Sequence, residues 1–158
     1  MKKMTFLLVV LLATVMVSCN NDDQDMNKNL VGEYSFTMSG NVRIFTDGVA
    51  DCNFKPVKAE RGTLKVIKGK VGYYEAVFCS NDGNIFFCDI EDDRDCVYLR
   101  NGEKTACVDG VDYTLLFHGS LQRSSTGFYG ELVCQGHKLN GFDTTVTSDK
   151  VNFIAERK

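Results

Sequence analysis

Seven cysteines and two histidines are the most reactive side chains in this chain of 158 residues. Two of the cysteines, Cys96 and Cys107, lie symmetrically about the pair Asn101-Gly102 in the stretch "DCVYLRNGEKTAC". Cysteines placed in this way serve as a redox couple, as metal ligands or as a disulfide. Redox and zinc sites usually need close spacings such as C-x-x-C, which this sequence lacks. The spacing therefore favours a disulfide.

The Asn101-Gly102 pair predicts a two-residue β-hairpin turn, because both residues tolerate a positive φ. In such a hairpin Cys96 faces Cys107 on the neighbouring strand. Counting from the turn makes them a hydrogen-bonded pair with a Cα separation of about 5.5 Å, which a disulfide can span. We predict that Cys96 and Cys107 are bonded and staple this hairpin.

The other cysteines give weaker predictions of pairing. Cys79 and Cys88 bracket the turn signal "NDG" at 81–83, and they face each other if the loop is long or a bulge shifts the register. Cys52 and Cys134 then form a third pair by elimination. Six cysteines permit many connectivities, so these two pairs stay open.

Two histidines and an acidic stretch are the remaining candidates for chemistry. His118 ends an expected strand on the face opposite Tyr113 and Phe117, where it could act as a base, line a pocket or simply contact water. His137 lies in "CQGHKLNG", which is loop-like in composition.

The stretch "DIEDDRD" at 89–95 holds five carboxylates around Arg94. Calcium favours such oxygen clusters, but Arg94 occupies the position where an EF-hand loop has glycine. We therefore expect a solvated turn rather than a metal site.

The sequence also lacks a nucleophile elbow, a zinc-protease helix motif and a P-loop. It predicts a protein that is not an enzyme and needs no metal or cofactor.

The N-terminus predicts export. "MKKMTFLLVVLLATVMVSC" has two lysines and a short apolar stretch, which is typical of a secretory signal peptide and too short to span a bilayer comfortably. Its end, Val17-Ser18-Cys19, resembles the lipobox of bacterial lipoproteins. This resemblance implies removal of residues 1–18, lipidation of Cys19 and attachment of the protein to a membrane through its acyl chains.

The polar stretch 19–29 predicts a disordered tether between the lipid and the folded domain. Its early Asp22 and Asp23 resemble the acidic signals of surface-exposed lipoproteins in Bacteroidetes-type bacteria; a plain solvated linker is the alternative. The resemblance implies a location in the cell envelope, at the outer membrane.

Removal of residues 1–18 leaves 16 basic and 21 acidic residues, without a basic patch. Nucleic acid is therefore not an expected partner.

These residues must be positioned by β-strands. Apolar residues from Leu30 onward alternate or form short runs between turn signals, without helical periodicity, which predicts one domain over 30–158. In adjacent pairs such as Phe86-Phe87, one ring points to each face of the sheet. Besides the hairpin around Asn101-Gly102, strands are expected at 33–38, 42–45, 62–68, 71–79, 84–90, 111–119, 127–134 and 150–157.

Short antiparallel strands joined by tight turns predict an all-β domain, either a single closed barrel or a two-sheet sandwich. The opening "LVGEYSF" at 30–36 and the closing "VNFIAER" at 151–157 resemble the first and last strands of lipocalin-like, calycin-type domains. This resemblance favours the barrel.

Two functions from different classes follow. The resemblance to lipocalin-like domains implies a non-enzymatic protein that binds a small apolar or amphipathic ligand in the barrel. The alternative is a surface interaction module that contacts an envelope protein or polysaccharide through its outer face, since contiguous outward aromatic residues mark such surfaces.

Overall fold

Alternating apolar and polar residues give extended strands along the whole part of the chain that the computed structural model describes. That part comprises residues 29–51, 53–70, 73–93, 95–139, 141 and 144–158. Within these ranges no helix is long and apolar enough to cross a membrane. The strands are β1 (Gly32–Thr46), β2 (Val49–Ala50), β3 (Lys55–Lys68), β4 (Tyr73–Ser80), β5 (Ile85–Asp92), β6 (Cys96–Val108), β7 (Val111–Arg123), β8 (Gly127–Lys138) and β9 (Thr144–Arg157).

The strands form one antiparallel sheet whose hydrogen bonds run around a ring. Sequential strands from β3 to β9 are neighbours, and β1 pairs with both β3 and β9. β2 continues the chain from β1 after a turn at Asp47-Gly48, where both residues have positive φ. The expectation of an all-β, antiparallel domain is confirmed, and the described strands belong to one sheet rather than two.

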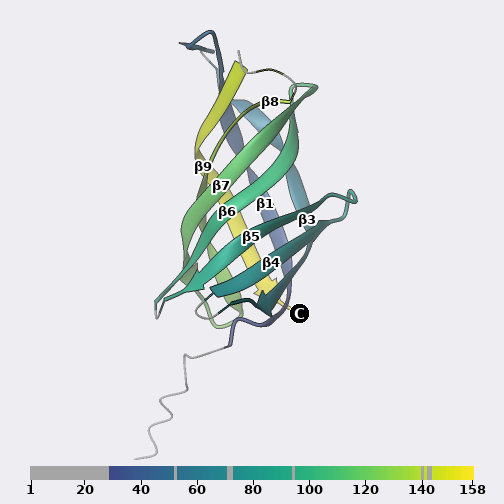
Figure 1. The fold of residues 1–158 in the computed structure, drawn as a ribbon, viewed down its shortest axis with the longest axis vertical. Coiled ribbons are helices and arrows are strands. Elements are labelled where there is room, and N and C mark those ends of the chain that lie inside the picture. Colours follow the sequence, from purple (N-terminus) through teal and green to yellow (C-terminus); the bar gives the residue numbers. More distant parts are fainter. Residues whose placement is uncertain (1–28, 52, 71–72, 94, 140, 142–143) are drawn as a thin grey trace, which may run out of the picture.

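The hairpin of β4 and β5 is shorter than its neighbours and points out from the side of the sheet (Figure 1). Beyond it, β3 pairs directly with β6 through Val57 and Val108. Lys58 of β3 forms a 2.9 Å ion pair with Asp82 in the hairpin turn. The ring therefore includes β4 and β5 at one end of the molecule and omits them at the other.

Inward side chains fill the ring in two clusters. The cluster that contains Phe36, Phe78 and Phe153 occupies the end where β4 and β5 take part. A smaller aliphatic cluster, which includes Val42 and Val108, occupies the other end. The predicted alternation is confirmed in the pair Phe86-Phe87, whose exposed fractions are 3% and 59%.

The predicted hairpin around Asn101-Gly102 is wrong. β6 runs without interruption from Cys96 to Val108, and the chain reverses at Asp109-Gly110, where both residues have positive φ. Cys96 therefore pairs with Gln122 and Cys107 with Asp112. At about 3.3 Å for each residue the two cysteines are roughly 36 Å apart. A disulfide between them within one chain is incompatible with this strand.

The other predicted disulfides are likewise not formed among the described residues. Cys79 lies opposite Ile85 and Cys88 opposite Ala76, and the two cysteines point to opposite faces of the sheet. Cys134 is a buried free thiol, and its predicted partner Cys52 lies outside the described residues. The described free thiols are those of Cys79, Cys88, Cys96, Cys107 and Cys134.

Several strand boundaries also differ from the prediction. The two strands predicted on either side of 39–41 belong to one strand, β1, which has shifts of register there against β3 and β9. His137 lies in β8 and pairs with Thr114 and Thr145, so it is not in a loop. The turn at 81–83 is confirmed, with a positive φ at Gly83.

Candidate functional site

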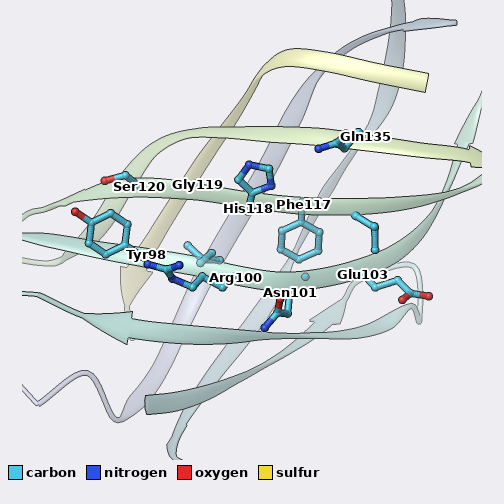
Figure 2. A pocket seen from close by; sticks show the side chains of 12 residues that line it. Tyr98, Arg100, Asn101, Glu103, Phe117, His118, Gly119, Ser120 and Gln135 are labelled. Atoms are coloured by element: carbon cyan, nitrogen blue, oxygen red, sulfur yellow. The ribbon is translucent and has the colours of Figure 1, made fainter. Parts of the chain in front are cut away.

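A hollow of about 690 Å³ lies on the outer face of the sheet, over β6, β7 and one residue of β8. Figure 2 shows Tyr98 and Ser120 at one end, Glu103 at the other, and Arg100 and His118 between them. This side of the ring is the one that carries the stretch predicted as a stapled hairpin. The outward side chains of β6 and β7 thus form the most developed candidate site.

A β-bulge produces the hollow. Leu99 pairs with Gly119 and Gly102 pairs with Phe117, so Arg100 and Asn101 together oppose His118 alone. Such an extra residue bends a strand and redirects its side chains, which is why bulges are frequent beside functional sites. Here it turns two consecutive side chains of β6, those of Arg100 and Asn101, toward solvent.

Asn101 supports the bulge with its backbone and its side chain. Its φ is 53°, in the left-handed region that asparagine tolerates better than most residues. Its Nδ2 donates a 2.7 Å hydrogen bond to Oδ2 of Asp89 on β5. This side-chain bond ties the bulged strand to its neighbour at the point where the ladder shifts register.

Gly102 serves the inner side of the same bulge. It is buried, and a Cβ atom at this position would overlap the ring of Phe117, which is itself buried. Any larger residue would have to displace that ring or the strand. The Asn101-Gly102 pair therefore combines a residue for the left-handed conformation with a residue for close packing, and it does not form a turn.

Two ion pairs lie beside the hollow. Nε of Arg100 lies 2.7 Å from Oε2 of Glu91, and its guanidinium carbon lies 5.7 Å from the centre of the Tyr98 ring. Asp92 forms an ion pair with Arg123. Asp89, Glu91 and Asp92 of the acidic stretch at 89–95 thus contact side chains of other strands. The described residues include no group of three or more metal-ligating side chains.

A second hollow of about 600 Å³ adjoins the first. Leu116 and Gln135 line both hollows. The second hollow extends over β8 and β9 to Phe45 of β1, past His137 and Thr147. His118 and His137 therefore lie on the same outer surface. The sequence did not predict this position for His137.

The interior contains a different polar group. Nζ of Lys104 lies 2.6 Å from Oε2 of Glu60, and both side chains are buried. Nζ also lies 5.7 Å from the centre of the Phe86 ring. Next to this pair, the amide of Cys134 donates a 3.2 Å hydrogen bond to Oγ of Ser148. Desolvation raises the pKa of the Cys134 thiol, opposed by Lys104 and by the hydrogen bond with Ser148.

The interior space beside Lys104 is small. A cavity of about 10 Å³ lies there, bordered by Met38, Leu115 and Cys134. A volume of this size is about enough for one water molecule. The buried ion pair is thus enclosed by packed side chains and has no room beside it for an organic ligand.

Sequence reasoning identified part of the outer site. His118 is exposed and faces away from Phe117, as expected. Leu116, Gln135 and Phe45 were missed, although the pair Leu115-Leu116 carries the same signal as Phe86-Phe87, with one member on each face. Cys19, the lipobox and residues 19–28 of the tether lie outside the described residues.

Comparisons with protein-family models, with curated proteins and with solved structures found no match for this chain. The resemblances to bacterial lipoproteins and to lipocalin-like domains therefore remain predictions that depend on the residues quoted for them.

Proposed function

We propose that this protein is a non-enzymatic binding module of the cell envelope, which contacts its partner through the outer hollow over β6, β7 and β8. The observation that supports this proposal is the location of the binding space. The outer hollow measures about 690 Å³, whereas the interior cavity beside Lys104 measures about 10 Å³. Pockets that bind small molecules usually measure some 300 to 1,000 Å³.

Binding of an apolar ligand inside the ring has less support. We infer that the closed sheet is a small β-barrel, and a barrel of about eight strands is just wide enough to be filled by side chains. Phe78 stacks on Phe86 with ring centres 4.6 Å apart and meets Phe36 edge-on at 5.1 Å. An interior ligand would have to displace these buried rings.

Attachment to a membrane through a lipid on Cys19 is part of the proposal. Nη2 of Arg157 donates a 2.7 Å hydrogen bond to the carbonyl of Asn29, so the described chain begins and ends at the same end of the sheet. A tether at 19–29 would leave from this end. The turn at Asp109-Gly110 joins β6 and β7 at the opposite end, where it would point away from the membrane.

A pair of matched variants tests the outer surface. Leu116 and Ile154 are outward strand residues with exposed fractions of 49% and 48%. Leu116 lines both outer hollows, whereas Ile154 lines neither of them. We expect Leu116→Lys to abolish binding of envelope material to the full-length protein in detergent, and Ile154→Lys to leave it unchanged. The measurement is surface plasmon resonance with separate envelope protein and polysaccharide fractions.

Equal binding by wild type and both variants would show that the hollow is not the contact surface.

Lipidation is tested separately, by mass spectrometry of the mature N-terminal peptide and by a Cys19→Ser variant. We expect the wild-type peptide to carry acyl chains and the variant to leave the membrane fraction.

A further inference from the structure

We propose that the two adjoining hollows form one binding groove for an uncharged polysaccharide chain. This inference rests on the proposed function, because it names the partner of the same outer surface. The hollows share Leu116 and Gln135, and together they extend from Tyr98 on β6 to Phe45 on β1. The groove crosses four strand spacings of about 4.8 Å, so it extends roughly 19 Å across the strands, which suits an oligosaccharide better than a single sugar.

The ladder pairings make the groove continuous across the strands. Glu103 pairs with Leu116, which pairs with Gln135, which pairs with Thr147. These four residues thus form one outward row across β6, β7, β8 and β9. Tyr98 and Ser120, themselves paired, extend the groove along the strands at its β6 end.

Side chains in the groove match the chemistry of a sugar. Carbohydrates present hydroxyl groups, which exchange hydrogen bonds with amide, hydroxyl and imidazole groups, and apolar C–H faces, which pack on aromatic rings. The groove offers a ring at each end, Tyr98 and Phe45, with Gln135 and His118 between them. Leu116 supplies apolar surface at the middle.

The charges of the groove disfavour an anionic chain. Among the described residues that line the two hollows, only Arg100 is a lysine or an arginine. Its charge is already neutralised by Glu91, whose Oε2 lies 2.7 Å from Nε of Arg100. Glu103 adds a negative charge to the same surface. Among the described residues that line the groove, a polyanion would meet the Glu103 carboxylate and no cluster of cations, and like charges repel. An uncharged chain incurs no such cost.

The closed sheet also disfavours an extended peptide as the ligand. Peptides that add a strand need an unpaired sheet edge for their main-chain hydrogen bonds. Under this groove β6, β7, β8 and β9 each pair with a strand on both sides. Recognition must therefore come from side chains, which suits hydroxyl-rich chains.

Affinity gel electrophoresis of the full-length protein in detergent tests the inference. The gels contain one of four uncharged polysaccharides (an α-glucan, a β-glucan, a mannan or a xylan) or the acidic polygalacturonate. We expect at least one uncharged polysaccharide to retard the wild type and polygalacturonate not to retard it. Tyr98→Ala and Phe45→Ala are each expected to weaken retardation about tenfold, the loss of one packing contact of roughly 1.4 kcal/mol.

Controls separate this inference from the proposed function. Tyr98→Phe keeps the ring and should keep most of the affinity, and Ile154→Lys should bind as wild type. Absence of retardation by all four uncharged polysaccharides overturns the inference, as does retardation that both alanine variants retain. If Leu116→Lys abolishes binding to an envelope protein while no polysaccharide binds, the proposed function stands and the polysaccharide is wrong. If neither fraction shows binding that depends on Leu116, both fail.

Discussion

The wall made by β6, β7 and β8 presents two different surfaces on the same three strands. Its inner side packs against the centre of the ring through Leu99, Phe117 and Leu132, all at most 1% exposed. Its outer side is a hollow of about 690 Å³, which has room for a ligand. Strict alternation would make the two sides mirror each other in spacing, but the bulge at Arg100 and Asn101 adds an outward residue without adding an inward one.

A local irregularity can thus shape one face of a sheet and leave the other face packed. Gly102 restores the inward sequence directly after the bulge, and Phe117 fills the space that its missing side chain leaves. Changes on the inner side should therefore affect stability, whereas changes on the outer side, such as Leu116→Lys, should affect binding.

The largest expected effect on the inner side concerns Lys104. Replacing it alone by methionine leaves Glu60 buried without its partner, and breaking a buried ion pair in this way costs about 3–5 kcal/mol. We expect Lys104→Met to lower the free energy of unfolding by that amount in urea titrations. The double variant Lys104→Met/Glu60→Leu should recover most of the loss. A single variant within about 1 kcal/mol of wild type would show that the pair is not desolvated.

A smaller effect is expected at the bulge itself. Gly102→Ala introduces a Cβ atom that overlaps the Phe117 ring, and overpacking of this kind costs about 1–3 kcal/mol. Phe117→Leu removes the overlapping ring atoms, so the two substitutions together should cost less than their sum. A double-mutant cycle in urea measures this coupling. Additive costs would mean that Gly102 is required for its backbone and not for the space beside it.

Part of the fold could be predicted from the sequence. The alternation of Tyr34, Phe36 and Met38 predicted inward side chains correctly, because one buried face imposes a period of two on a strand. The all-β class followed from the same pattern. The turn at 81–83 was found because its glycine signal lies between two short apolar runs.

The candidate site could not be located in this way, because two turn signals compete in the same stretch. Asn101-Gly102 and Asp109-Gly110 both favour positive φ, and local propensity ranks the first at least as high. What decides between them is tertiary: the ring of Phe117 needs the space at Gly102, and β6 must reach Val57 of β3. The predicted disulfide failed with the predicted turn, since it depended on that register.

The smallest effect on the free energy of unfolding is expected for the thiols on the two faces of this wall. Cys134 points inward from β8, and Cys107 is exposed on β6. Burial raises the pKa of Cys134 above the ordinary value of 9.0. A thiol whose folded pKa is raised stabilises the fold below its unfolded pKa, and that contribution is lost as the pH rises past about 9 toward the folded pKa.

We therefore expect the free energy of unfolding of the wild type to fall between pH 8 and pH 10, by at most about 1.4 kcal/mol per pH unit from this thiol. Cys134→Ala should lower stability at pH 8 through the lost packing, yet show a shallower fall toward pH 10. Cys107→Ala, which removes an exposed thiol, is the matched control for the substitution itself. Urea titrations at both pH values measure the slopes. If Cys134→Ala has the same slope as the wild type, burial of the inner thiol does not contribute to the pH dependence of stability, and this prediction is wrong.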